Sequence, residues 1–166
     1  MRKRNLVPRL LLTVSVIVPL GLLAAQVERA PRDIKKPQFL NPAGLNKPSG
    51  YTHVVVTQPG KLVYISGQVA WNASEEIVGK GDLRAQVTQA LENLKTALAA
   101  AGVTAEDLIK VNYYVVDLKP DQVPIIREIR GRYFSTEHPP ASTLVGVTAL
   151  AREDFMIEIE AVAAVK

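Results

Sequence analysis

The chain has 166 residues, 48% of them hydrophobic and 22% charged, so it can build one substantial core but not two. It contains no cysteine, which excludes a disulfide framework, a thiolate nucleophile and a sulfur-ligated metal site. The formal net charge of +4 arises from four N-terminal basic residues, Arg2, Lys3, Arg4 and Arg9. Without these four, the 20 basic residues fall to 16, which equals the number of acidic residues. The net charge of the remaining chain therefore does not support a nucleic-acid-binding surface.

Residues 1–25 have the layout of a secretory signal: basic residues, then an apolar run from Leu10 to Ala25, then polar residues. At about 1.5 Å per residue the run would form a helix of roughly 24 Å, shorter than the roughly 30 Å hydrocarbon core of a bilayer. The sequence therefore predicts a signal peptide, with an uncleaved N-terminal anchor as the alternative. Both place the folded domain outside the cytoplasm, periplasmic or secreted. A membrane contact, through residues 10–25, is expected only if the signal is uncleaved.

Residues 26–50 form a Pro-rich segment without a 2-residue or 3.6-residue apolar period. This composition predicts an extended tether, in which Phe39 and Leu40 are the candidates for packing onto the domain. The folded domain is expected to span residues 51–166.

The domain begins with two β-branched runs, His53–Thr57 and Lys61–Ser66, on either side of Pro59-Gly60. Proline followed by glycine suits a tight type II turn, so the pattern predicts a β-hairpin. Gln68–Trp71 is a candidate third strand, and the polar residues 72–81 are expected to form a loop.

A leucine-rich stripe predicts a helix that begins near Asp82 and ends at Gly102. Its apolar residues recur at spacings of 4, 4, 3 and 4, which places them on one face: Leu83, Val87, Leu91, Leu94 and Leu98. A face of this kind is expected to cover a sheet.

The second half predicts a strand at Leu108–Val116, a helix at Val123–Phe134, and strands at Ser142–Thr148 and Phe155–Val165. Alternation in the last strand places Glu158 and Glu160 on the face opposite its apolar residues. The resulting fold class is α/β (α+β), a mixed sheet with both helices on one face. The other face would be uncovered, so self-association is expected.

Six segments, in order from Tyr51 to Val165, resemble successive signatures of the Rid (reactive intermediate deaminase, YjgF-like) family. The matching segments are Tyr51, Tyr64-Ile65-Ser66-Gly67-Gln68, Gln89-Ala90-Leu91-Glu92-Asn93-Leu94, Val115-Val116-Asp117-Leu118, Pro140-Ala141-Ser142-Thr143 and Ile157-Glu158-Ile159-Glu160-Ala161. The resemblance implies a chorismate-mutase-like fold that assembles as a homotrimer, with small-molecule clefts between subunits. It further implies hydrolysis of enamines and imines to ketoacids and ammonia, without metal or cofactor.

Carried over residue by residue, the resemblance makes Glu158 the catalytic residue that handles water or a proton. Tyr51, Gly67, Ser142 and Leu144 become the substrate-binding positions. Active members of the family have an arginine where this chain has Ser142, and that arginine pairs with the substrate carboxylate. A serine offers one neutral donor instead of two parallel charged ones, so efficient deamination of amino-acid-derived substrates is not expected. The alternatives are a non-catalytic trimer that binds a small metabolite and an interaction protein that has lost the pocket.

Other candidate groups favour structural interpretations. His53 and His138 have no ligand partner at a suitable spacing, so no metal site is predicted. Arg152 could replace the missing cation or lie in a solvated turn. Three arginines lie close together in the second predicted helix and just after it: Arg127, Arg130 and Arg132. They could support the ribonuclease label used for some family members, or they could form a solvated helix face balanced by Glu128. The second interpretation predicts no nucleic-acid partner.

Overall fold

The computed structural model describes residues 37–57 and 60–165, all of which belong to one compact unit. The predicted signal or anchor at 1–25 and the first part of the tether lie outside the described residues. In the part of the chain that the structure describes, no helix is long and apolar enough to span a bilayer.

Four strands form a mixed sheet in the order β3-β6-β4-β5. Strand β6 is antiparallel to both β3 and β4, whereas β5 runs parallel to β4. A parallel pair needs a crossover connection, and here the helix between β4 and β5 supplies it. The strands are β3 (Lys61–Gln68), β4 (Leu108–Val116), β5 (Ala141–Val147) and β6 (Ile157–Val165).

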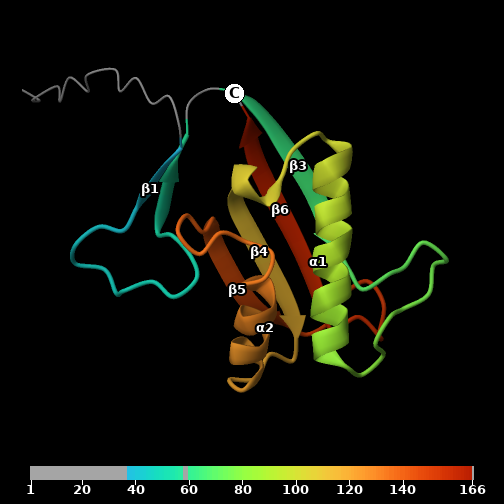
Figure 1. Cartoon of the computed structure of the whole chain (residues 1–166). Coiled ribbons are helices and arrows are strands. Elements are labelled where there is room, and N and C mark those ends of the chain that lie inside the picture. Colours follow the sequence, from blue (N-terminus) through green and yellow to red (C-terminus); the bar gives the residue numbers. More distant parts are fainter. Residues whose placement is uncertain (1–36, 58–59, 166) are drawn as a thin grey trace, which may run out of the picture. The chain divides into compact units, whose positions relative to one another are not determined.

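Both helices, α1 (Leu83–Ala100) and α2 (Gln122–Arg130), lie side by side on one face of this sheet (Figure 1). The Asp82 side chain caps α1 by accepting a hydrogen bond from the backbone N–H of Ala85 at 3.2 Å. Gly102, at φ 72°, follows the helix, and a short 3₁₀ turn (η1, Ala105–Asp107) leads into β4. The predicted apolar stripe is buried: Leu83, Val87, Leu91, Leu94 and Leu98. The α+β fold class expected from the sequence is confirmed.

The strands that cross the core alternate between the two faces of the sheet. Ile157 and Ile159 of β6 are fully buried beneath the helices, so the intervening Glu158 faces the opposite side. That opposite face carries large apolar side chains with substantial exposure: Leu62 at 43%, Tyr64 at 74% and Val145 at 39%. The second face therefore presents apolar surface that the helices do not cover.

The predicted N-terminal hairpin is wrong. Strand β2 (Val54–Val56) pairs with β1 (Gln38–Leu40), which comes from the predicted tether, while β3 pairs with β6 over its length. The tether also supplies Phe39, whose ring stacks on His138 with centroids 5.0 Å apart. The Phe39 segment packs onto the domain, and its strand β1 takes the place expected for β3 beside β2.

The end of α2 and the start of β6 are among the element boundaries that differ from the sequence prediction. Helix α2 ends at Arg130 and not at Phe134, because the chain turns at Gly131. Strand β6 begins at Ile157 and not at Phe155, since the preceding residues belong to the turn that connects it with β5.

Candidate functional site

Gly67 and Glu158 lie against each other where β3 meets β6. The register of this strand pair shifts between Ile65 and Gln68, and the irregularity contains Gly67. A Cβ atom placed on Gly67 would collide with the carboxylate of Glu158. Glycine is therefore required for Glu158 to keep its position, and the structure brings these two predicted site residues together.

Ser142 and Leu144 lie on the other face of the sheet. They are the parallel partners of Val111 and Tyr113, both of which are buried on the helix side. Directly paired residues project to the same face, so Ser142 and Leu144 also point toward the helix layer, where Leu144 packs against the core. Glu158 is paired with Tyr114, the neighbour of Tyr113, and projects the opposite way.

Tyr51 lies near the beginning of β5. Its neighbour Thr52 pairs with Ala141, donating its backbone N–H to Pro140 O at 3.3 Å and its hydroxyl to Pro139 O at 2.6 Å. The Tyr51 hydroxyl accepts a hydrogen bond from Asn46 Nδ2 at 3.1 Å. Tyr51 thus belongs to the β5 edge of the sheet, with Ser142 and Leu144, and not to the β3–β6 strand pair that holds Gly67 and Glu158.

A hydrogen-bonded network surrounds Glu160 on the uncovered face. Its carboxylate accepts hydrogen bonds from Asn112 Nδ2 at 2.7 Å and from the Tyr114 hydroxyl at 2.8 Å. These two hydrogen bonds, that from Asn112 first, hold the pKa of Glu160 below its ordinary value. Burial lowers the pKa of the nearby Lys110 amine, which donates to Thr143 Oγ1 at 2.6 Å. The network therefore positions the Glu160 carboxylate and favours its ionised form.

The lowered pKa predicts a pH-dependent contribution of Glu160 to stability. A carboxyl group with a depressed folded-state pKa stabilises the fold above its unfolded-state pKa of about 4.3, and that contribution disappears as the pH falls through the folded-state pKa. We expect Glu160→Gln to lower the free energy of unfolding near neutral pH and to approach wild type below about pH 4. Urea denaturation over this pH range tests this, with the exposed Glu153→Gln as control; a deficit that is constant with pH would contradict it.

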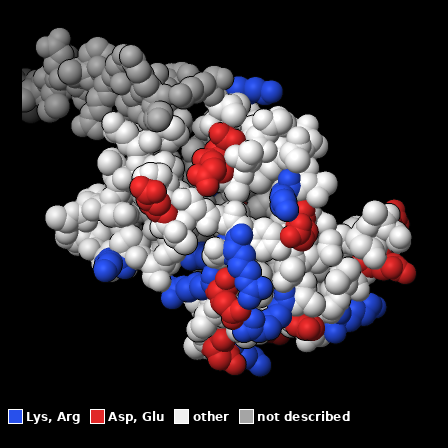
Figure 2. All heavy atoms as spheres, viewed as in Figure 1, with Lys and Arg blue, Asp and Glu red and all other residues white. Residues whose placement is uncertain are grey.

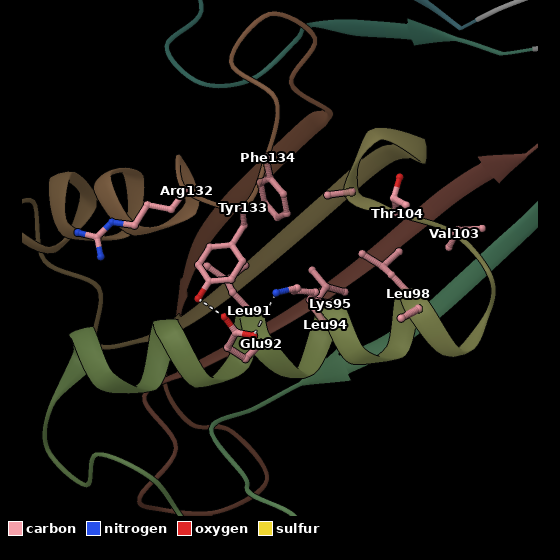
Figure 3. A pocket seen from close by; sticks show the side chains of 12 residues that line it. Leu91, Glu92, Leu94, Lys95, Leu98, Val103, Thr104, Arg132, Tyr133 and Phe134 are labelled. Carbon is pink, nitrogen blue, oxygen red and sulfur yellow. Dashed lines mark hydrogen bonds and ion pairs between the residues drawn. The ribbon is translucent and has the colours of Figure 1, made fainter.

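A cavity of about 540 Å³ lies on the helix side of the molecule (Figure 3). Its walls are mostly apolar, including Leu94 and Leu98 of α1 and Phe134 after α2. At its rim the Tyr133 hydroxyl donates a 2.8 Å hydrogen bond to Glu92. None of the site residues expected from the sequence lines this cavity, so Glu158 does not belong to it.

The arginines singled out from the sequence have three different environments. Arg132 pairs with Glu128 at 2.7 Å, as Arg84 does, and charges of both signs lie together on this part of the helix face (Figure 2). The guanidinium of Arg152 lies over the Trp71 ring, 4.4 Å from its centroid. Arg130 is only 6% exposed, so the expectation of a solvated helix face is wrong for this residue. The signal for its burial is the stripe that it continues after Ile126 and Ile129.

Known proteins include clear relatives of this chain. A family model described as Endoribonuclease L-PSP matches residues 44–165. A RutC family protein of Pyrococcus horikoshii is 36% identical over 118 residues, covering 70% of this chain and 89% of the relative. A 2-iminobutanoate/2-iminopropanoate deaminase of Dermatophagoides farinae is 30% identical over 109 residues, covering 66% of this chain and 82% of the relative.

The solved structures include a similar fold. The crystal structure of YyfB from Yersinia pestis, a member of the conserved Rid protein family, has 39% sequence identity and a TM-score of 0.74. The match covers 78% of this chain and 98% of YyfB. The resemblance noted in the sequence is therefore confirmed, and the chain belongs to the Endoribonuclease L-PSP family, which includes the Rid and RutC proteins.

Proposed function

We propose that the chain is a Rid-family enamine and imine deaminase-like protein that binds a small molecule in clefts between the subunits of a homotrimer. The observation that carries this proposal is the fit between Gly67 and Glu158, which holds a carboxylate on the uncovered face of the sheet. Similarity to a 2-iminobutanoate/2-iminopropanoate deaminase supports the reaction class.

The placement of the site residues supports a cleft between subunits. Ser142 and Glu158 project from opposite faces of the sheet, so one chain cannot direct both side chains into one cavity. A second copy whose Glu158 face covers the β5 edge of the first would bring them together. The exposed Leu62, Tyr64 and Val145 provide the apolar surface for such an association.

In the proposed reaction, Glu158 accepts a proton from water as the water oxygen bonds to the imine carbon. The proton is then delivered to the nitrogen, which gives a carbinolamine. The hydroxyl proton of the carbinolamine passes to the same nitrogen as the carbon–nitrogen bond breaks, and a carbonyl compound and ammonia leave. Hydrolysis of this kind involves no change of oxidation state. Ser142, with its single neutral donor, would hold a substrate carboxylate poorly, so turnover of imino acids is expected to be slow.

The test compares wild type with Ser142→Arg in an assay of 2-iminopropanoate hydrolysis at low substrate concentration. Restoring a charged, bidentate partner should raise the rate at least about 30-fold, which corresponds to the lower end of the 2 to 5 kcal/mol expected for such a pair. The double variant Ser142→Arg with Glu158→Gln should lose this gain. Equal rates in wild type and Ser142→Arg would contradict the role given to Ser142. Hydrolysis by neither protein would favour the non-catalytic, metabolite-binding alternative.

Export is part of the proposal. Its support is the order of basic, apolar and polar residues in the first 28 positions, which is typical of a secretory signal. The anchored form, with residues 10–25 kept in the membrane, is the alternative.

A further inference from the structure

Arg130 is a buried cation without an acidic partner in the described parts of the chain. It is 6% exposed, and no carboxylate in residues 37–57 or 60–165 forms an ion pair with it. One terminal nitrogen donates to Ser49 O at 3.2 Å, and the guanidinium lies 5.7 Å from the centroid of the Tyr113 ring. A guanidinium has five N–H donors, so the backbone carbonyl satisfies only part of its capacity.

The phenol beneath Arg130 does not serve as its counter-ion. Burial raises the pKa of Tyr113 well above its ordinary value, and the charge of Arg130 offsets this only in part. Tyr113 is therefore neutral at physiological pH. The Ser49 carbonyl and the Tyr113 ring compensate this buried charge only in part, and an incompletely paired buried charge is costly, so an anion is the partner that chemistry would select.

A cavity lies where that anion would be needed. It has a volume of about 280 Å³ and is bounded by the end of α2, by Ser49-Gly50 and by the segment that leads into β5. Arg130 lines it together with the exposed Arg127, so two arginines border a single space. Ser135 and Thr136 add hydroxyl groups to its wall. The volume is below the range of roughly 300 to 1,000 Å³ typical of drug-sized ligands, which favours a small one.

We propose that this cavity binds a small carboxylate, with Arg130 as the buried pairing cation and Arg127 as a second cation. Guanidinium groups suit carboxylates because they offer parallel charged donors. Phe134 and Pro139 contribute apolar wall that a short alkyl chain can contact and a bare inorganic oxyanion cannot use. None of the residues assigned to the proposed cleft lines this cavity: Tyr51, Gly67, Ser142, Leu144 and Glu158.

The cavity adjoins the predicted substrate-binding edge. Gly50, which lines it, precedes Tyr51 in the chain, and a Cβ atom at Gly50 would meet the Arg130 guanidinium. Pro139 precedes the start of β5 and accepts the Thr52 hydroxyl. An anion bound to Arg130 would therefore stabilise the loop that carries Tyr51.

The experiment measures thermal unfolding of the full-length chain with increasing pyruvate, its neutral analogue pyruvamide, phosphate and chloride. We expect pyruvate to raise the melting temperature saturably while pyruvamide and chloride do not. Arg130→Gln should abolish this shift, and Arg127→Gln should weaken the apparent affinity about tenfold, equivalent to one unit of log Kd. Arg132→Gln removes the same charge from an exposed position paired with Glu128 and should leave the shift unchanged.

Several outcomes would overturn the inference. Equal stabilisation by pyruvate and pyruvamide would show that no anion is recognised. Stronger stabilisation by phosphate that disappears in Arg130→Gln would make this an inorganic oxyanion site. A pyruvate shift lost in Glu158→Gln but retained in Arg127→Gln would place the carboxylate in the proposed cleft. If Arg130→Gln fails to fold, Arg127→Gln and the charge-reversing Arg127→Glu still test the site. A pyruvate-induced rise in melting temperature that is unaltered in both variants is sufficient to reject it.

Discussion

Replacing Gln86 with leucine should lower the free energy of unfolding by about 2 kcal/mol or more, at nearly constant side-chain volume. Gln86 is fully buried in α1 and connects the helix with two loops. Its Nε2 donates to Gly79 O at 3.2 Å and to Asp154 O at 2.7 Å, while its Oε1 accepts from the backbone N–H of Met156 at 2.8 Å. Leucine would leave Asp154 O and the Met156 N–H without these partners, each costing roughly 1 to 3 kcal/mol, whereas Gly79 O keeps its hydrogen bond from the backbone N–H of Asp82 at 2.9 Å.

Urea denaturation measures this loss, and Gln89→Leu is the matched control. Gln89 is on the same helix, is half-buried, and donates to Asn93 Oδ1 at 2.8 Å, within a single turn. Gln89→Leu should lower the free energy of unfolding by less than about 1 kcal/mol, since it removes a single hydrogen bond, to the Asn93 side chain near solvent. Equal losses in the two variants would show that the backbone groups held by Gln86 find other partners.

A single methyl group at Gly67 should disable the proposed site. The Cβ of Gly67→Ala would occupy the space of the Glu158 carboxylate, so either the carboxylate rotates away or β3 shifts from β6. Because the colliding atoms belong to the flexible Glu158 side chain, we expect a loss of stability at or below the lower end of the about 1 to 3 kcal/mol typical of overpacked positions. In the Ser142→Arg background, imine hydrolysis should fall roughly 100-fold, because a displacement of about 1 Å is enough to separate a catalytic group from its substrate.

The control for Gly67→Ala is Ser66→Ala, one residue earlier in the same strand. Ser66 is exposed, so the loss of its hydroxyl should change stability little. Denaturation and the hydrolysis assay together separate a local collision from a general weakening of β3. Full activity in Gly67→Ala would mean that Glu158 is not the acting carboxylate.

Much of the fold follows from periodicity in the sequence. The leucine stripe of α1 gives the position, the start and the buried face of this helix, because a 3.6-residue repeat leaves one stable orientation on a sheet. The alternation in β6 likewise separates Glu158 from its apolar neighbours. The pairing of Gly67 with Glu158 follows the family resemblance, and its physical basis, the close approach of a carboxylate, becomes visible only in three dimensions.

The remaining features depend on contacts that periodicity does not encode. β1 and β2 have three residues each, and alternation in so short a strand does not identify its partner. Because charge is normally found at the surface, the sequence favours exposure of Arg130, although its spacing from Ile126 and Ile129 continues the buried stripe. The separation of Ser142 from Glu158 depends on the parallel register of β4 and β5, which the sequence does not specify.

That register has an evolutionary consequence. Since position 142 and the Gly67–Glu158 contact belong to opposite surfaces of the same sheet, a replacement at one need not be compensated at the other. A gene encoding this fold can therefore accept a new residue at 142 in one mutational step while its acidic group stays in place. Diversity in what related chains recognise would then accumulate along β5, and the β3–β6 contact would change slowly.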